Sequence, residues 1–121
     1  MKIISFAWTT PALLAGRKTC TRRTWSDDYA RRFKAGEIVA AYDRGPRNGG
    51  KQVAIIRLLQ TPYQERVNEA PDPDYEAEGL QWMEEQGKLI QGLPPSVFWR
   101  QWQRDNPLVW VVRFELINGA M

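Results

Sequence analysis

The sequence predicts an α+β fold, a small five-stranded, mostly antiparallel barrel with helices packed over its openings. Three observations lead to this prediction. The chain has 121 residues, which suits a single domain over 1–121. Its five predicted strands and four predicted helices follow one another without regular strand–helix–strand alternation. A glycine-rich stretch over 44–50 joins two of the strands, as in an antiparallel hairpin.

The first elements are short. The apolar stretch 2–7 predicts a buried strand. Thr9 or Thr10 is expected to cap a brief helix, which ends at Gly16, where a left-handed conformation suits glycine. The threonine-rich stretch 19–24 predicts the second strand.

A helix and a hairpin follow. Ser26 is expected to cap a helix that runs to about Lys34. The stretches 38–42 and 52–60 predict two strands, joined by the exposed loop 44–50.

The second half alternates less clearly. Residues 61–75 contain three prolines and many charges, which predicts a long connecting loop. The stretch 75–86 predicts one helix, and Pro94–Ser96 begin another. The apolar stretch 108–116 predicts the last strand.

Composition excludes several kinds of catalysis. The chain contains no histidine, so no Ser-His-Asp or Cys-His pair can form within it, nor a His-ligated metal site. Cys20 is the only cysteine, so it has no internal disulfide partner, and we expect it to be a small buried apolar side chain. Neither a metal nor a cofactor is expected, and any catalysis must use Lys, Asp, Glu, Ser, Thr, Tyr or Arg.

Charge is distributed unevenly along the chain. Residues 16–51 contain ten basic and four acidic side chains, a net charge of +6, whereas residues 61–90 have a net charge of −6. The basic stretch could attract a nucleic acid. Alternatively, the two stretches could meet within the fold, which from charge alone is the interpretation we favour.

No stretch approaches the ~20 apolar residues of a membrane span, and the first residues lack the apolar core of a signal peptide. From these features we expect a cytoplasmic protein with no membrane partner.

The octet Gly16–Arg23, with the sequence GRKTCTRR, resembles the signature of ASCH domains, which belong to the PUA-like superfamily. That signature reads G-x-K-x-x-E-x-R. Gly16, Lys18 and Arg23 match it, and Thr21 stands in the glutamate position. This departure looks like the branch of small bacterial N4-acetylcytidine amidohydrolases, whose motif reads G-R-K-T-x-T-x-R.

Three further matches extend the resemblance over most of the chain. They are the K-x-G-[ED] turn at Lys34–Glu37, the E-x-E pattern at Glu76–Glu78, and the V-x-x-F-E strand at Val111–Glu115. The resemblance implies a PUA-like barrel.

The resemblance also implies a site. Lys18, Thr21 and one acidic residue would be catalytic, with Glu78 as the aligned glutamate and Glu76 as its rival. Since a threonine hydroxyl needs a neighbouring base, Lys18 could serve as that base or could remain charged and stabilise an oxyanion. On a regular strand Lys18 would face away from Thr21, so it must lie in the turn after Gly16.

Other residues were assigned to ligand binding. They are Gly16, Arg22, Arg23 and Trp25. The two arginines could hold a phosphate or a base edge, and Trp25 could stack on a base, as could Trp99, Trp102 or Tyr42. For most of these aromatic side chains, core packing is the alternative that we favour.

Two functions are therefore expected. One is an amidohydrolase acting on an acylated nucleoside such as N4-acetylcytidine, with the nucleoside as its small-molecule partner. The alternative is an RNA-binding PUA-like module, with or without ribonuclease activity, that uses the basic face formed by 16–51. Oligomeric state does not follow from the sequence.

Overall fold

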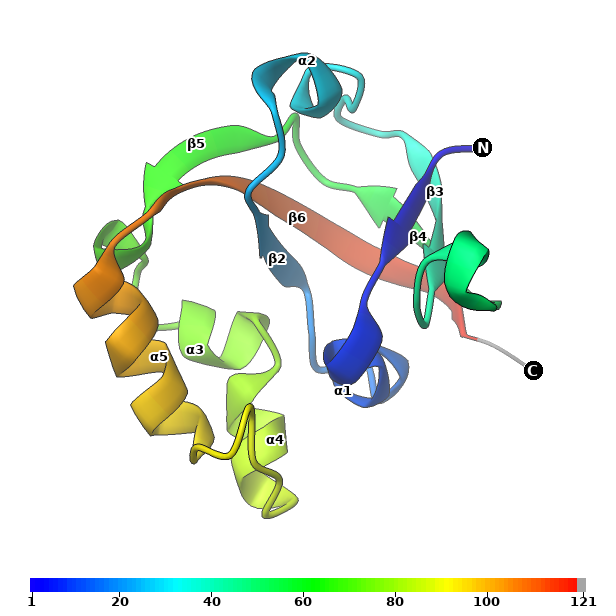
Figure 1. Ribbon diagram of the computed structural model, residues 1–121. Coiled ribbons are helices and arrows are strands. Elements are labelled where there is room, and N and C mark those ends of the chain that lie inside the picture. Colours follow the sequence, from blue (N-terminus) through cyan, green and yellow to red (C-terminus); the bar gives the residue numbers. More distant parts are fainter. Residues whose placement is uncertain (120–121) are drawn as a thin grey trace.

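A computed structural model describes residues 1–119, whose central feature is one curled, mixed sheet (Figure 1). The six strands are β1 (Ile3–Ser5), β2 (Cys20–Arg23), β3 (Ile38–Tyr42), β4 (Gln52–Leu58), β5 (Tyr63–Arg66) and β6 (Leu108–Gly119). The helices are η1 (Ala7–Thr9), α1 (Thr10–Leu14), α2 (Asp27–Ala30), η2 (Pro46–Asn48), η3 (Val67–Glu69), α3 (Asp74–Ala77), α4 (Leu80–Glu85) and α5 (Pro95–Asp105). The predicted small α+β barrel is confirmed, as a half-barrel whose sheet does not close.

The strand order is β1-β3-β4-β6-β2, and β5 pairs with β6 beside the end of β4. Only β1 and β3 are parallel, and the other pairs are antiparallel. The register shifts once between β3 and β4 and once between β4 and β6. Such irregularities bend strands, and here they accompany the curl that brings β1 and β2, the two ends of the sheet, toward each other.

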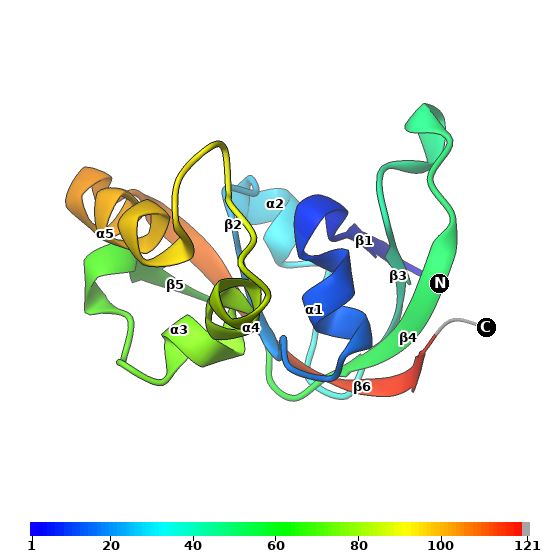
Figure 2. The ribbon, with the colours of Figure 1, turned by 90° about the horizontal axis from the view of Figure 1, so that it is seen from below.

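The helices α3, α4 and α5 gather on one side of the molecule, beside β2 and the first half of β6, while α1 lies at the open side of the curl (Figure 2). In the described part of the chain, no helix is long and apolar enough to cross a membrane.

Two apolar clusters fill the interior. The first lies inside the curl and includes Ile4, Leu13, Phe33, Ile56 and Phe114. The second packs β2, β5 and β6 against α4 and α5 and includes Leu80, Met83, Trp99, Val109 and Val111. The space between the two clusters contains the cavity described below.

Two predictions for 61–86 are wrong. The stretch 61–75 is not a loop throughout, because Tyr63–Arg66 pair with β6 as β5, the sixth strand. The single helix expected over 75–86 is two helices, because Gly79 adopts a positive φ of 91° and turns the chain between α3 and α4. Glycine adopts this conformation without steric cost.

Two smaller predictions fail at helix ends. The helix after Ser26 ends at Ala30 rather than near Lys34, since Phe33 turns into the apolar interior. Ser26 does cap it, accepting a hydrogen bond from the backbone N–H of Tyr29. The hydroxyl of Thr9 does not cap α1 and instead donates to the backbone oxygen of Phe6.

Candidate active site

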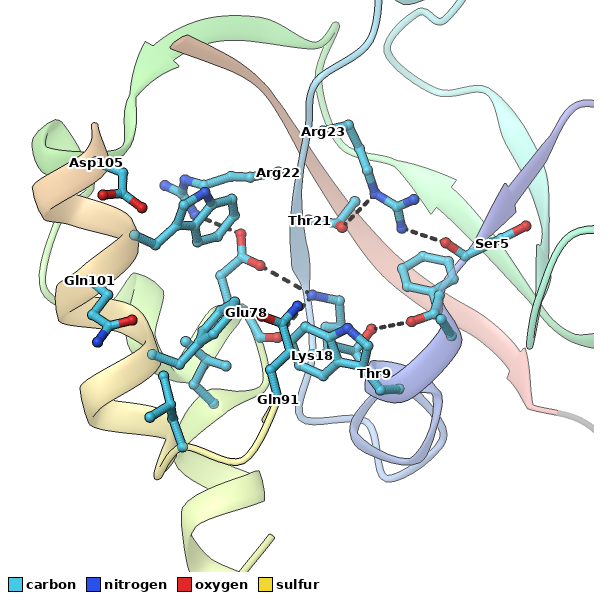
Figure 3. A pocket seen from close by; sticks show the side chains of 17 residues that line it. Ser5, Thr9, Lys18, Thr21, Arg22, Arg23, Glu78, Gln91, Gln101 and Asp105 are labelled. Atoms are coloured by element: carbon cyan, nitrogen blue, oxygen red, sulfur yellow. Dashed lines mark hydrogen bonds and ion pairs between the residues drawn. The ribbon is translucent and has the colours of Figure 1, made fainter. Parts of the chain in front are cut away.

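A cavity of about 520 Å³ lies between the open edge of the sheet and α5 with the loop that precedes it (Figure 3). Both apolar clusters contribute to its walls, through Phe6 from the first and Leu80 from the second. One wall is aromatic and consists of Trp8, Phe98 and Trp102. Lys18, Thr21 and Glu78, the three residues that the sequence resemblance marks as catalytic, all line this cavity.

Lys18 is 2% exposed although it carries an amine. Gly16, with a φ of 75°, follows the end of α1 and lies two residues before Lys18. β2 begins two residues after Lys18, at Cys20. Lys18 therefore lies in the turn between Gly16 and β2, as expected from the sequence. Its Nζ donates to the backbone oxygen of Glu78 at 2.8 Å and to Oε1 of Glu78 at 3.3 Å.

Glu78 owes its position to the break between α3 and α4. A Cβ placed on Gly79 would lie 2.8 Å from Cβ of Ala12 and 3.3 Å from Cβ of Lys18. Because Gly79 lacks that atom, the chain passes close enough to α1 for Glu78 to present both its backbone oxygen and its carboxylate to Lys18. Glu78 is 6% exposed.

Burial lowers the pKa of Lys18, and the nearby Glu78 carboxylate only partly opposes this effect. Removal from water penalises the charged ammonium, whereas the carboxylate favours it. The net effect lowers the pKa of Lys18 from its usual value, the direction that a general base requires.

Arg22, assigned from the sequence to ligand binding, lines the cavity and also lies within a cluster of carboxylates. Its guanidinium donates to Glu78 Oε2 at 2.7 Å, to Glu65 Oε1 at 2.8 Å and to Asp74 Oδ2. Its side chain is fully buried and lies 5.7 Å from the Trp99 ring centroid. Arg22 thus borders the cavity, but three of its hydrogen bonds go to carboxylates of the protein and are not free for a ligand.

Asp74 joins Arg22 to Arg113. The two terminal nitrogens of Arg113 donate to the Asp74 carboxylate oxygens at 3.0 and 2.8 Å. Burial alone would raise the pKa of Asp74, but hydrogen bonds from Arg113 and Arg22 outweigh it and hold that pKa below its usual range. The carboxylate is therefore charged at neutral pH.

Thr21 and Arg23 lie at the gap between the two ends of the sheet. Arg23 Nε donates to Thr21 Oγ1 at 3.0 Å, and Arg23 Nη2 donates to the Ser5 backbone oxygen on β1 at 2.6 Å. Arg23 consequently bridges β2 and β1, as Figure 3 shows. With its oxygen already accepting from Arg23, the Thr21 hydroxyl can direct its own hydrogen elsewhere.

The remaining sequence-assigned residues lie outside the cavity. Gly16 ends α1, and Trp25 stacks on Phe33 with ring centroids 4.8 Å apart. Glu76, the rival of Glu78, forms a partly exposed ion pair with Arg17. Trp25 lines a different, more open hollow beside β1.

Cys20 is fully buried, as expected, and burial raises the pKa of its thiol to about 12. Within residues 1–119, no group of three or more His, Cys, Asp or Glu side chains could hold a metal ion.

Sequence reasoning missed several cavity residues, notably Trp8 and Gln91. Trp8 is 45% exposed, but its exposure follows from the fold and nothing in the sequence around it marks it. Nothing in the local pattern marked Gln91, because its orientation depends on a positive φ in the loop before α5.

Comparison with known proteins adds evidence on the fold. No protein-family model matches the chain, and no curated protein matches it. The crystal structure of protein EF3133 from Enterococcus faecalis V583, described with the family model DUF984, superposes with a TM-score of 0.63. The similarity covers 99% of this chain and 82% of that chain at 19% sequence identity. At this identity the likeness shows a shared fold alone.

Proposed function

We propose that this protein is an amidohydrolase that removes the acyl group from an acylated nucleoside such as N4-acetylcytidine. One observation carries the proposal. Lys18, Thr21 and Glu78, which the resemblance to ASCH domains selected from separate segments, line a single cavity in which Lys18 binds Glu78. A residue set chosen from motifs and brought together by the fold is what an active site requires.

In the proposed reaction Thr21 is the nucleophile. Its Oγ attacks the carbonyl carbon of the substrate amide, and its hydroxyl proton passes to neutral Lys18. The tetrahedral intermediate then breaks its C–N bond, and the proton moves from Lys18 to the departing amine of cytidine. Water cleaves the resulting Thr21 ester, which releases acetate and restores the hydroxyl.

The surrounding contacts suit these roles. Burial favours the neutral amine of Lys18 that the first step needs. The hydrogen bond from Arg23 to Thr21 Oγ1 would stabilise negative charge that develops on this oxygen. Glu78 orients Lys18 and accepts a proton from the attacking water in the second step, while Arg22 holds its other oxygen.

The RNA-binding alternative receives less support from the contacts. Arg17, Lys18 and Arg22 are paired with carboxylates, chiefly from the acidic stretch 61–90. The exposed basic residues that remain in 16–51 lie just after α2 and in the loop between β3 and β4, which are well separated in Figure 1. Phosphate contacts would be spread over two sites rather than along one groove.

The test is hydrolysis of N4-acetylcytidine by the purified protein, followed by chromatography of the cytidine released. We expect turnover by the wild type and a loss of about 100-fold or more in Thr21→Val, which keeps the shape but removes the nucleophile. Thr19→Val, at an exposed neighbouring position, is the matched control and should stay within about twofold. Failure of the wild type to hydrolyse any acylated nucleoside, or full activity of Thr21→Val, would overturn the proposal.

A further inference from the structure

The loop before α5 contains a tight turn that faces the cavity. Ile90 and Leu93 form a two-residue antiparallel bridge, with backbone N–O distances of 2.8 and 2.9 Å. The two residues between them, Gln91 and Gly92, have φ angles of 51° and 80°. Positive φ at both central positions is typical of a hairpin turn that prefers Asn-Gly, so glutamine is an unfavourable choice at the first of them.

This strain is confined to few places. Within residues 1–119, only Ala7, Gln91 and Asn106 combine a positive φ with a side chain. Asn106 ends α5, where asparagine is common. Ala7 and Gln91 both line the cavity and approach it from different elements. Backbone strain of this kind tends to persist where function requires a particular side-chain direction.

Figure 3 shows the direction that the turn gives to Gln91, whose side chain reaches from the loop toward Lys18 and Glu78. Gln91 is exposed at the edge of the cavity, and its carboxamide makes no hydrogen bond to any other residue described in 1–119, so its donors and its acceptor can turn from water to a ligand. A carboxamide can satisfy a ring edge that carries both a donor and an acceptor, such as the edge of a pyrimidine base.

The other walls of the cavity fit the same ligand. Trp8 and Phe98 pack edge to face with ring centroids 5.7 Å apart and offer apolar surface to a flat ring. The polar side chains on the α5 side are Gln101 and Asp105, one neutral and one acidic. This side of the cavity therefore favours an uncharged ring over a phosphate group.

We propose that Gln91 is a binding residue for the polar edge of an uncharged pyrimidine base or nucleoside, and that the strained turn keeps its carboxamide in the cavity. The assignment rests on the proposed function for the identity of the ring and extends it to a residue outside the resembled motifs.

The test measures binding and turnover separately. Cytidine, which carries the ring but no acyl group, is titrated into the protein and followed by tryptophan fluorescence, because Trp8 and Trp102 line the cavity. Gln91→Glu keeps the length of the side chain but replaces the amide donors with a charge, and we expect cytidine binding to weaken about tenfold or more. Gln64→Glu on the exposed face of β5 is the matched control and should remain within about twofold.

A second variant separates binding from structure. Gln91→Asn keeps the carboxamide but shortens the side chain, and asparagine accepts the positive φ more readily. We expect a melting temperature a few degrees higher together with weaker cytidine binding. A residue with a purely structural role would not move these two quantities in opposite directions.

The outcomes distinguish the two proposals. Wild-type protein that binds cytidine but hydrolyses no acylated nucleoside would overturn the amidohydrolase and leave the role of Gln91 standing. Hydrolysis by the wild type with unchanged cytidine binding in Gln91→Glu would overturn the role of Gln91. Absence of any cytidine binding to the wild type would also overturn it.

Discussion

Ten basic side chains lie between residues 16 and 51, and the fold divides them into two groups with different environments. The first group comprises Arg17, Lys18, Arg22 and Arg23, which lie at or beside the cavity and contact protein oxygens. The second comprises Arg31, Arg32, Lys34, Arg44, Arg47 and Lys51, which are all exposed. The net charge of the segment is thus a poor guide to its partners, because much of the charge is already balanced within the fold.

The comparison confirms the interpretation that the basic and acidic stretches meet. Asp74, Glu76 and Glu78 belong to the acidic stretch, and each pairs with an arginine or a lysine from the first group. These contacts join the α3–α4 segment to β2 and the turn before it. The exposed group provides natural controls for substitutions in the first group.

The largest expected effect concerns catalysis. Lys18→Met keeps much of the apolar volume but removes the amine, and we expect the rate of N4-acetylcytidine hydrolysis to fall about 1,000-fold, within the range for loss of a general base. Lys34→Met, in the exposed group, should stay within about twofold. Steady-state kinetics on both variants checks the prediction, and equal activities would remove Lys18 from the mechanism.

The next effect concerns stability. Arg22→Met leaves Asp74 and Glu78 buried without one of their partners, and we expect a loss of about 3–5 kcal/mol in the free energy of unfolding. Arg57 and Glu115 form an exposed pair at 2.9 Å, and Arg57→Met should cost under about 1 kcal/mol. Urea denaturation measures both. Similar losses in the two variants would show that the buried cluster is no more important to folding than a surface pair.

A smaller effect depends on pH. The pKa of Asp74 is lowered in the folded protein, so its stabilising contribution is present above the unfolded carboxyl pKa of 3.8 and is lost as the pH falls through the lower folded value. We expect Asp74→Asn to be less stable than the wild type at pH 7 and the difference to narrow below about pH 4. A difference that stays constant down to pH 2 would contradict the ionic role of Asp74.

Features encoded by adjacent residues were predictable from the sequence. The β3–β4 hairpin follows from two apolar stretches around a glycine-rich loop, and both strands and their antiparallel pairing are confirmed. β5 was not predictable, because it lies in a stretch rich in prolines and charges that resembles a loop, and only pairing with β6, more than 40 residues away, makes it a strand. The need for a glycine at position 79 also comes from residues far away in the sequence. Ala12 and Lys18 pack so close to this position that they leave no room for a Cβ.

The same distinction applies to the site. The octet Gly16–Arg23 identified Lys18 and Thr21 as candidates, but it could not show that Arg22 would be taken up by Glu65, Asp74 and Glu78. The sequence favoured Glu78 over Glu76 within the E-x-E pattern, but it could not show that the turn at Gly79 places the two side chains in different environments. One pairs with Arg17 at the surface, and the other lies buried beside Lys18.

These two glutamates provide the most direct test of the central claim that the buried charges form the active site. The measurement is kcat/KM for N4-acetylcytidine hydrolysis in Glu78→Gln and Glu76→Gln, two substitutions of identical chemistry two residues apart. We predict a loss of about 100-fold or more for Glu78→Gln and a change within about threefold for Glu76→Gln. Equal losses in the two variants, or a larger loss in Glu76→Gln, would contradict the account.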